Sequence, residues 1–284
     1  MVPTTAPTPR TLLVVDDDSA IHDLVRAILA RSEWKVDCVE SGEEAIARLE
    51  TGPYDLVLTD ILMPGMDGLT LLGHIRDRHP DARIVVMTVA NTPDHILRSL
   101  RGEAAGYMSK PLFRETLLTT LETALTTPQN PGDIRILSDL PHWISLQVAC
   151  RLSTASRLTQ FVRELPGDLS PDERERIATA FRELLMNAIE YGGHFDPKQT
   201  VELSYIRTAH SIVYYVRDPG EGFSFAKLDH AAIANTGDEP FRHSALREQM
   251  GMRPGGFGLL MAKNFADELI YSAKGNEVIF IKYV

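Results

Sequence analysis

The sequence predicts two domains of different class: a doubly wound, parallel α/β domain followed by an α+β two-layer sandwich. Three observations carry this prediction. Apolar strand patterns and helical patterns alternate one by one as far as residue 125. Beyond residue 133, helices and strands occur instead in separate groups. The segment between them, TTPQNPGD, contains two prolines and a glycine and has little to bury, which is typical of an interdomain linker.

The chain length agrees with two domains, since 284 residues exceed the usual size of one. The expected organisation is a disordered tail over residues 1–10, a first domain over 11–125, a linker over 126–133 and a second domain over 134–284. The tail is rich in proline and threonine and has no apolar signal core.

Composition and charge restrict the classes of function. Hydrophobic residues make up 44% and charged residues 24% of the chain, as in ordinary globular proteins. The net charge of −10 disfavours nucleic acids and anionic membranes as partners, because both require a positive surface. No apolar run is long enough to span a bilayer, and Cys38 and Cys150 lie in no metal-binding or redox spacing. We therefore expect a soluble, cytoplasmic protein that binds neither nucleic acid nor membrane.

The first domain contains five strand patterns, each followed by a helical one. The strands are expected at residues 12–15, 34–39, 56–58, 84–87 and 107–108. The helices are expected at residues 21–29, 45–49, 69–75, 96–100 and 117–125. Strands that are each followed by a helix pair in parallel, with helices on both faces of the sheet. In such sheets the functional residues gather at the carboxyl ends of the strands.

The second domain has a different order of elements. A strongly amphipathic helix is expected over residues 172–191, because its apolar residues recur every three to four positions. The other helices are expected at residues 153–165 and 259–265, and the strands at 143–149, 200–206, 211–217 and 277–283. Helices and antiparallel strands grouped in this way predict an α+β sandwich.

Polar side chains follow the strands of the first domain where those strands end. Asp16 and Asp17 follow the first strand and Asp60 the third, while Thr88 ends the fourth and Lys110 follows the fifth. Because the carboxyl ends of parallel strands meet at one edge, we expect these side chains to lie together. Clustered carboxylates suit a hard cation such as Mg²⁺, and a carboxylate beside that ion can attack a phosphoryl group. Each acid alone could be a solvated turn or a helix cap, but their joint occurrence favours a site.

The segments LLVVDDD, LVLTDILMPGMDG, VVMT and GYMSKP resemble the response-regulator receiver family, whose fold is flavodoxin-like, over residues 11–125. The resemblance implies that an upstream histidine kinase or a small phosphodonor phosphorylates Asp60. It further implies Mg²⁺ ligands at Asp16, Asp17 and Asp60, a phosphate-binding lysine at Lys110, a switch hydroxyl at Thr88 and a switch aromatic at Tyr107. A plain core position for Tyr107 stays open, since most aromatic residues in strands simply pack. Pro111 completes the family's Lys-Pro pair, which is often cis there.

One helix of the second domain carries polar residues at a regular interval. Glu183, Asn187 and Tyr191 lie one helical turn apart beside the apolar stripe, so they could line a pocket over the sheet. A solvated helix edge is an equally good interpretation of the same spacing.

Two glycine-rich strings of the second domain could contact a nucleotide. DPGEGF follows a strand. Its glycines would let the backbone approach a flat base, and its carboxylate could accept a hydrogen bond from an exocyclic amine. RPGGFG precedes a helix, and a glycine-rich turn at the N-terminus of a helix is suited to binding phosphates. A plain hairpin turn and an ordinary loop are the alternatives. The candidate residues of the two strings are Asp218, Gly220, Gly222, Gly255, Gly256 and Gly258.

The order and spacing of these features resemble the Bergerat-type (GHKL) ATPase family over residues 134–284. That family includes histidine kinases, type II topoisomerase ATPase domains and anti-sigma-factor serine kinases. The resemblance implies that the domain binds ATP and Mg²⁺, with Asn187 holding Mg²⁺ against the phosphates. It makes Glu183 the general base and Asp218 the acid that reads adenine, with Tyr191 and the glycines beside the nucleotide. Residues 223–254 would form a mobile lid.

The second domain resembles the serine-kinase branch most, in ELLMNAIEYGG and DPGEGF. A histidine kinase would need a helical hairpin with a phosphoacceptor histidine before the ATPase domain, and no histidine here has such surroundings. We therefore expect a response regulator whose output domain is a serine/threonine protein kinase of the anti-sigma-factor type. An ATP-dependent module that sequesters its partner without catalysis and an atypical histidine kinase remain alternatives. The expected partners are an upstream histidine kinase, an anti-sigma antagonist or sigma-factor-like regulator, and a second copy in a homodimer.

Overall fold

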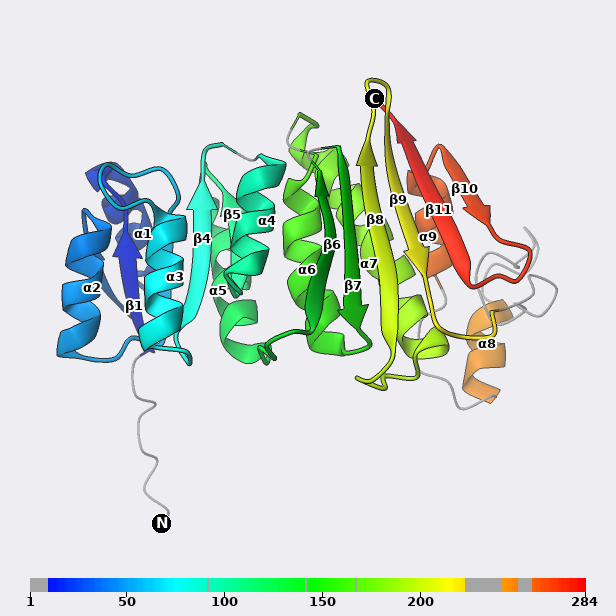
Figure 1. Cartoon of the computed structure of the whole chain (residues 1–284), viewed down its shortest axis with the longest axis horizontal. Coiled ribbons are helices and arrows are strands. Elements are labelled where there is room, and N and C mark those ends of the chain that lie inside the picture. Colours follow the sequence, from blue (N-terminus) through cyan, green and yellow to red (C-terminus); the bar gives the residue numbers. More distant parts are fainter. Residues whose placement is uncertain (1–9, 91, 141, 167, 223–241, 250–256) are drawn as a thin grey trace, which may run out of the picture. The chain divides into compact units, whose positions relative to one another are not determined.

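The computed structural model describes residues 10–90, 92–140, 142–166, 168–222, 242–249 and 257–284. The chain divides into two compact units, Met1–Gln129 and Asn130–Val284 (Figure 1). The last helix of the first unit ends at Thr126, one residue into the segment expected as a linker. Within the described residues, no helix is both long enough and apolar enough to pass through a membrane.

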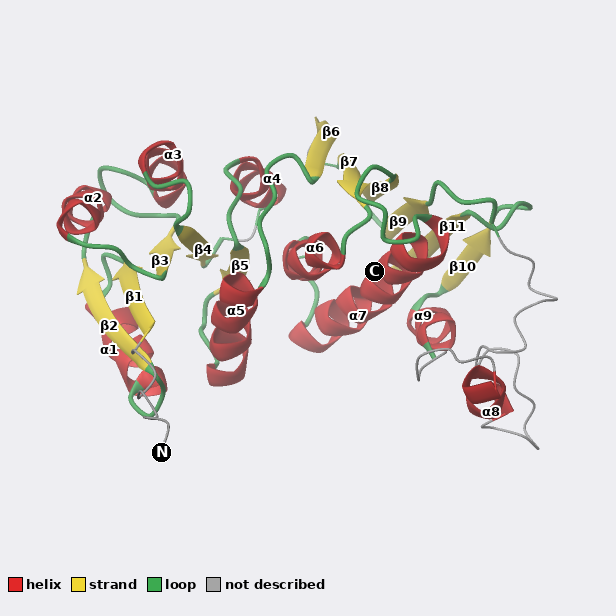
Figure 2. Cartoon of the chain, turned by 90° about the horizontal axis from the view of Figure 1, so that it is seen from below, coloured by secondary structure: helices red, strands yellow, loops and turns green. Residues whose placement is uncertain are grey.

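The first unit is a five-stranded parallel sheet with the strand order β2-β1-β3-β4-β5. Its strands are β1 (Arg10–Val15), β2 (Trp34–Val39), β3 (Leu56–Asp60), β4 (Arg83–Thr88) and β5 (Gly106–Ser109). Its helices are α1 (Ser19–Leu29), α2 (Gly42–Thr51), α3 (Gly68–Arg78), α4 (Pro93–Arg101) and α5 (Arg114–Thr126). Helices α1 and α5 cover one face of the sheet, and α2, α3 and α4 cover the other (Figure 2). The doubly wound parallel fold is confirmed.

The central strands of this sheet are apolar throughout because helices cover both of its faces. Residues 12–15 of β1 and residues 56–58 of β3 have no exposed surface. Burial of these uninterrupted runs fixes both strands in the middle of the sheet. The polar residues at their carboxyl ends, Asp16 and Asp60, consequently lie at one edge.

Four helices of the first unit begin at a side chain that accepts a hydrogen bond from a backbone N–H of the first turn. Asp18 caps α1 at 2.9 Å, Ser41 caps α2 at 3.3 Å, Asp67 caps α3 at 2.6 Å and Thr92 caps α4 at 3.2 Å. Such caps satisfy N–H groups that have no partner inside the helix. Of the three acids that follow β1, Asp18 is therefore a helix cap, and Asp16 and Asp17 remain for the site.

The second unit contains a six-stranded antiparallel sheet with the strand order β10-β11-β9-β8-β7-β6. Its strands are β6 (Ile134–Leu140), β7 (Trp143–Ala149), β8 (Thr200–Arg207), β9 (Ser211–Arg217), β10 (Glu268–Tyr271) and β11 (Glu277–Tyr283). Its α-helices are α6 (Leu152–Glu164), α7 (Pro171–Asn187), α8 (Arg242–Gln249) and α9 (Gly258–Phe265). Helices α6, α7 and α9 lie on one face of the sheet (Figure 2). The expected two-layer arrangement of helices on an antiparallel sheet is confirmed.

An aromatic cluster fixes α7 on this sheet. The ring of Tyr214 in β9 lies 5.4 Å from that of Phe181 in α7, 5.4 Å from that of Tyr205 in β8 and 6.1 Å from that of Phe280 in β11. All four side chains are buried. Large aromatic residues bury much area and pack in defined geometries, so this cluster determines how α7 lies over the sheet.

Four elements of the second unit differ from expectation. Strands β6 and β10 were not predicted, because both are edge strands whose residues alternate between half-buried and exposed and so lack an apolar run. Helix α8 was not predicted either. The helix expected over residues 172–191 ends as an α-helix at Asn187 and continues as one π-helical turn, η1 (Ala188–Gly192). Apolar periodicity does not distinguish a single π turn from the α-helix before it.

Candidate functional site

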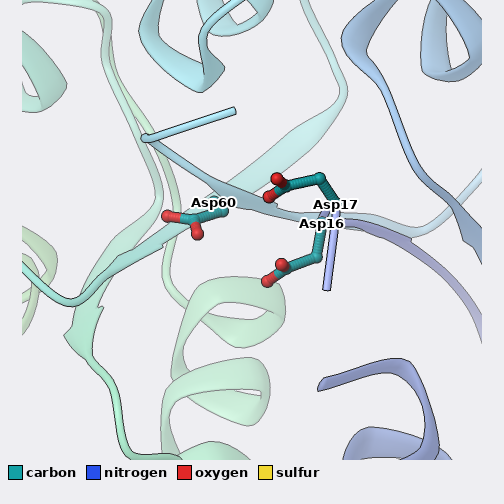
Figure 3. Close-up of side chains that lie close together, drawn as sticks. All are labelled: Asp16, Asp17 and Asp60. Carbon is teal, nitrogen blue, oxygen red and sulfur yellow. The ribbon is translucent and has the colours of Figure 1, made fainter. Parts of the chain in front are cut away.

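Three carboxylates meet at the carboxyl edge of the parallel sheet. Asp16 and Asp17 follow β1, and Asp60 is the last residue of β3 (Figure 3). One oxygen from each of the three lies within 4.8 Å of the others. Asp16 and Asp60 are buried, whereas Asp17 is exposed and leaves the cluster open to solvent on its side. The three acids therefore lie together, as the positions of their strands predicted.

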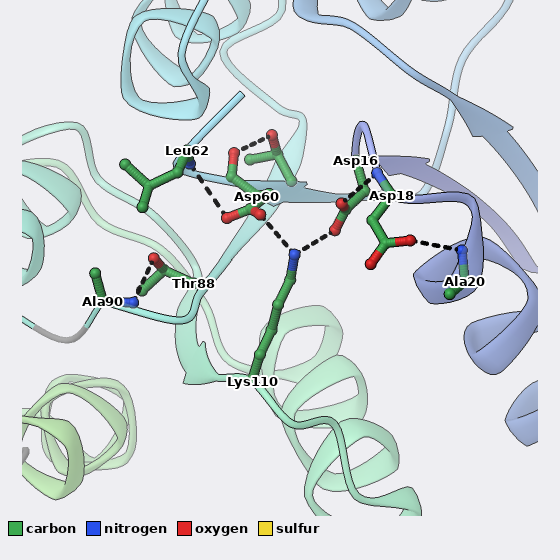
Figure 4. Close-up of polar contacts among 9 residues, drawn as sticks. Asp16, Asp18, Ala20, Asp60, Leu62, Thr88, Ala90 and Lys110 are labelled. Atoms are coloured by element: carbon green, nitrogen blue, oxygen red, sulfur yellow. Dashed lines mark hydrogen bonds and ion pairs between the residues drawn. The ribbon is translucent and has the colours of Figure 1, made fainter. Parts of the chain in front are cut away.

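Lys110, which follows β5, supplies the positive charge of this cluster. Its Nζ atom lies 2.5 Å from Oδ2 of Asp60 and 2.7 Å from Oδ2 of Asp16 (Figure 4). Burial alone would lower the pKa of Lys110, but the hydrogen bonds to Asp16 and Asp60 and their charges raise it above its ordinary value. Burial also raises the pKa of Asp16, against the opposing contacts with Lys110 and the Asp18 N–H.

The donor set of this cluster fits a hard divalent cation. Carboxylate oxygens are the ligands that Mg²⁺ prefers, and the ion completes its coordination with water. Asp16, Asp17 and Asp60 offer three such oxygens, and the exposed Asp17 gives water access to them. These residues would hold the ion.

The backbone around Asp60 is held closely by its neighbours. A Cβ atom at Gly68 would lie 1.8 Å from the carbonyl oxygen of Asp60, so only glycine fits there. The Thr59 hydroxyl donates to the same carbonyl at 3.0 Å, and the Leu62 N–H donates to Oδ1 of Asp60 at 3.2 Å. We did not single out Gly68 from the sequence, although a glycine directly after the capping Asp67 was a usable signal.

The two predicted switch residues are buried beside this site. Thr88 ends β4 and is fully buried, and its Oγ1 accepts a hydrogen bond from the Ala90 N–H at 3.1 Å (Figure 4). Tyr107 lies in β5 opposite Val86 of β4, with 2% of its surface exposed. The Lys110–Pro111 peptide bond is cis. Both switch roles stay predictions.

In the second unit, Asp218 lies directly after β9 against a π-helical turn. Its Oδ1 accepts a hydrogen bond from the Gly220 N–H at 2.8 Å. A Cβ atom at Gly192, the last residue of η1, would lie 2.3 Å from the same oxygen. Burial raises the pKa of Asp218, and the hydrogen bond from Gly220 and the charge of Lys274 offset this in part. The carboxylate is therefore held by backbone on two sides.

The turn between β10 and β11 supports the DPGEG segment. The Asp218 N–H donates to the Asn276 carbonyl at 3.0 Å, and the Asn276 amide donates to the Asp218 carbonyl at 3.3 Å. The Lys274 ammonium donates to the Gly220 carbonyl at 3.0 Å. Gly222 has a φ of 84°, and a Cβ atom there would lie 2.0 Å from the Lys274 carbonyl oxygen. Asn276 and Lys274 were not predicted, because nothing in their local sequence indicates which loop they support.

The predicted residues of α7 have different surroundings. Glu183 lies against the start of α9, since a Cβ atom at Gly258 would lie 2.4 Å from Oε2 of Glu183. The Glu183 side chain is 27% exposed and lies 3.4 Å from the Arg182 guanidinium. Asn187 is the half-buried last residue of α7. Tyr191 belongs to the π turn and is 45% exposed.

Part of the predicted nucleotide site lies outside the described residues. Gly255 and Gly256 are not among the described residues. Of the lid expected over residues 223–254, only α8 is described. Gly192 is a candidate that the sequence interpretation missed, although the Gly-Gly pair after Tyr191 was a signal for close backbone approach.

Two protein families match the chain in succession. Residues 12–122 match the family described as response regulator receiver domain. Residues 148–282 match the family described as histidine kinase-like ATPase domain.

Curated relatives match part of the chain. The DNA-binding transcriptional regulator NtrC of Salmonella typhimurium is 34% identical over 126 residues, which are 43% of this chain and 27% of that protein. The regulatory protein VanRB of Enterococcus faecalis is 36% identical over 114 residues, which are 40% of this chain and 51% of that protein. The chain thus spans from about a quarter to about half of the length of these relatives.

Solved structures match a similar share of the chain. The chemotaxis response regulator CheY4 of Vibrio cholerae is 28% identical, with a TM-score of 0.40, over 42% of this chain and 100% of that one. The response regulator protein TrrA of Thermotoga maritima, in complex with Mg(2+)-BeF, is 34% identical, with a TM-score of 0.38, over 41% of this chain and 99% of that one. On the two successive family matches and the two folds described above, the chain contains a response regulator receiver domain followed by a histidine kinase-like ATPase domain.

Proposed function

We propose that Asp60 is the phosphoacceptor of this response regulator, and that the output domain uses ATP to phosphorylate a serine or threonine of a partner protein. The observation that supports the kinase reaction best is the position of Glu183. Its partly exposed carboxylate lies against Gly258, the first residue of α9. Sequestration of a partner without catalysis would not need a carboxylate there, whereas a kinase needs a group that receives the hydroxyl proton.

At the receiver site, a carboxylate oxygen of Asp60 attacks the phosphorus of a phosphohistidine on an upstream histidine kinase or of a small acyl phosphate. The bond from phosphorus to the leaving group breaks, and the leaving group takes the electron pair. Lys110, already 2.5 Å from Asp60, neutralises negative charge on the acceptor and on the phosphoryl oxygens. Asp16, Asp17 and Asp60 would hold Mg²⁺, which would supply further charge neutralisation.

At the output site, the Asp218 carboxylate would accept a hydrogen bond from the exocyclic amine of adenine, and Asn187 would hold Mg²⁺ beside the phosphates. Glu183 receives the proton of the partner's hydroxyl, whose oxygen attacks the γ-phosphorus. The bond between that phosphorus and the bridging oxygen breaks, and ADP leaves with the electron pair. Tyr191 and the glycines at 220, 222, 255, 256 and 258 complete the proposed nucleotide contacts.

The test uses the full-length protein with γ-labelled ATP, Mg²⁺ and a lysate fraction from the source cells. We expect acid-stable label on a partner protein, absent with Glu183→Gln. The matched control is Asp172→Asn, which removes an exposed carboxylate at the other end of α7 and is expected to leave transfer unchanged. Acid-labile label would point to histidine chemistry instead. ATP binding without any transfer would contradict the kinase proposal and favour the sequestering module.

A further inference from the structure

Asp218 is the first residue beyond the end of β9, where the pairing of β9 with β11 ends. The last pair is Arg217 with Glu277, so Asn276 lies opposite Asp218 one step further on. The Asp218 N–H donates to the Asn276 carbonyl at 3.0 Å, as a further bond of the ladder would. The Asp218 carbonyl accepts at 3.3 Å from the side-chain amide of the same residue. One residue thus binds both backbone groups of Asp218.

The side-chain bond anchors the peptide unit that leads from Asp218 to Pro219. This unit has no N–H, because its second residue is a proline, so only its carbonyl oxygen can be hydrogen-bonded. Among the residues that the structure describes, the Asn276 amide is the partner of this oxygen. Since a carbonyl oxygen only accepts, the amide nitrogen of Asn276 faces it. Asn276 is 7% exposed, so the bond is shielded from water.

The orientation of this peptide unit determines where the Asp218 carboxylate points. Pro219 is followed by Gly220, whose N–H donates to Oδ1 of Asp218 at 2.8 Å. A Cβ atom would lie 2.8 Å from Oδ1 at Gly220 and 2.3 Å from it at Gly192, so backbone encloses this oxygen and Oδ2 remains for a ligand. Rotation of the unit between Asp218 and Pro219 would move the Gly220 N–H, and the carboxylate with it. The bond from Asn276 therefore fixes the direction of Oδ2.

A second contact on the same segment comes from Lys274, which donates to the Gly220 carbonyl at 3.0 Å. Lys274 is exposed, so water can take the place of its ammonium at this carbonyl. The buried Asn276 is consequently the residue of the turn between β10 and β11 whose loss the Asp218 backbone cannot replace.

We propose that Asn276 is a specificity-determining positioning residue of the nucleotide site, which favours purines with a 6-amino group by fixing the acceptor oxygen of Asp218. This inference rests on the proposed contact between Asp218 and adenine. A 6-amino group donates and gains from an acceptor at a fixed place, whereas a 6-oxo group is itself an acceptor and gains nothing from it. Asn276 acts through Asp218, so its effect is on the discrimination between the two kinds of purine. Contacts with the ribose and phosphates, which both kinds share, are unaffected.

The test compares the affinities of the full-length protein for ATP and for inosine triphosphate, measured by isothermal titration with Mg²⁺. Inosine triphosphate carries a 6-oxo group in place of the 6-amino group and has the same ribose and phosphates. Asn276→Leu keeps nearly the shape of asparagine and has no donor. We expect it to weaken ATP binding by about fivefold, which corresponds to one typical net hydrogen bond, and to leave inosine triphosphate binding unchanged. Asn264→Leu, the same substitution at an exposed position of α9, should change neither affinity.

Asn276→Ser gives a second measurement should the leucine variant fail to fold. Its hydroxyl adds no bulk and lies one bond nearer to the backbone, too far from the Asp218 carbonyl, so the preference for ATP is expected to fall in this variant too. A merely structural asparagine would lower the melting temperature and weaken both nucleotides alike. Equal losses for the two nucleotides, or a wild-type preference in the variants that fold, would overturn the proposal.

Asp218→Ala distinguishes this failure from a failure of the proposed function. If Asp218 accepts from adenine, this variant loses the preference for ATP, whatever the outcome at Asn276. A protein that binds no ATP, or an Asp218→Ala variant that keeps the wild-type preference, would count against the proposed adenine contact itself. A preference that is lost in Asp218→Ala but kept in both Asn276 variants would refute only the role of Asn276.

Discussion

The backbone of Gly192 lies against the carboxylate of Asp218, so close that a Cβ atom at position 192 would lie 2.3 Å from Oδ1. The two residues are brought together by the π-helical turn after Asn187 and by the end of β9. The backbone carbonyl and the side-chain amide of Asn276, in the turn between β10 and β11, both hold the backbone of Asp218, so its carboxylate has little room to withdraw. The orientation of the proposed adenine-reading acid therefore depends on the absence of a side chain in the helix next to it.

Gly192→Ala should weaken ATP binding. The added methyl group must displace the Asp218 carboxylate, and the loss of one well-oriented, charge-assisted hydrogen bond corresponds to a fall in affinity of about tenfold or more. The measurement is isothermal titration of the full-length protein with ATP and Mg²⁺. Gly73→Ala is the control, since a Cβ atom there meets nothing within 4 Å. Unchanged ATP affinity in Gly192→Ala would contradict the assigned role of Asp218.

Lys110→Met should prevent efficient phosphorylation of Asp60. The methionine replaces the unbranched stem of the lysine but leaves Asp16 and Asp60 without the ammonium that lies 2.7 Å and 2.5 Å from them. Removal of such a preorganised charge lowers rates by about 100-fold or more. The measurement is the initial rate of phosphorylation by acetyl phosphate. Lys35→Met, at an exposed position of β2, should react like the wild type. A Lys110→Met protein that reacts at the wild-type rate would refute the proposed role of this lysine.

Asp60→Ala should uncouple the output domain from phosphodonors. In the wild-type protein we expect the rate of ATP-dependent labelling of the partner to change when acetyl phosphate is added. The change should vanish in Asp60→Ala, because no other group then carries the phosphoryl charge that biases the receiver. Asp77→Ala, at an exposed position of α3, should keep the response. If Asp60→Ala responds as the wild type does, the receiver does not control the output domain through this residue.

Cys150 should make stability depend on pH in the alkaline range. The thiol has no exposed surface, and its burial raises its pKa to about 11 in the folded state. In the unfolded chain the thiol has a lower pKa and loses its proton first. Between the two pKa values the unfolded chain therefore binds fewer protons than the folded one. The folded state consequently loses stability as the pH rises towards about 11. Urea unfolding at about pH 8 and about pH 10.5 should show a larger loss for the wild type than for Cys150→Ala. An equal loss in the two proteins would assign the alkaline destabilisation to other groups.

The sequence by itself determined the class of both folds and the convergence of the carboxylate cluster. The reason is that these features follow from local patterns together with one general rule. Apolar runs identified β1 and β3 as buried strands, and parallel strands end at the same edge. From these facts alone, Asp16 and Asp60 had to be neighbours, and Lys110 after β5 had to lie at the same edge.

The contacts of the nucleotide site were decided only by the tertiary structure. Gly192 contacts Asp218, and Gly258 contacts Glu183. Both pairs are too far apart in the sequence for a helical or strand period to relate them. The edge strand β10, too short and too exposed to have an apolar pattern, brings Asn276 to the backbone of Asp218 through the turn that follows it. Local patterns record which face of an element is buried, because burial selects apolar side chains at the period of that element. They do not indicate which backbone atoms come close together when two elements pack. Such close contacts decide where only glycine fits and which carboxylate is held in place.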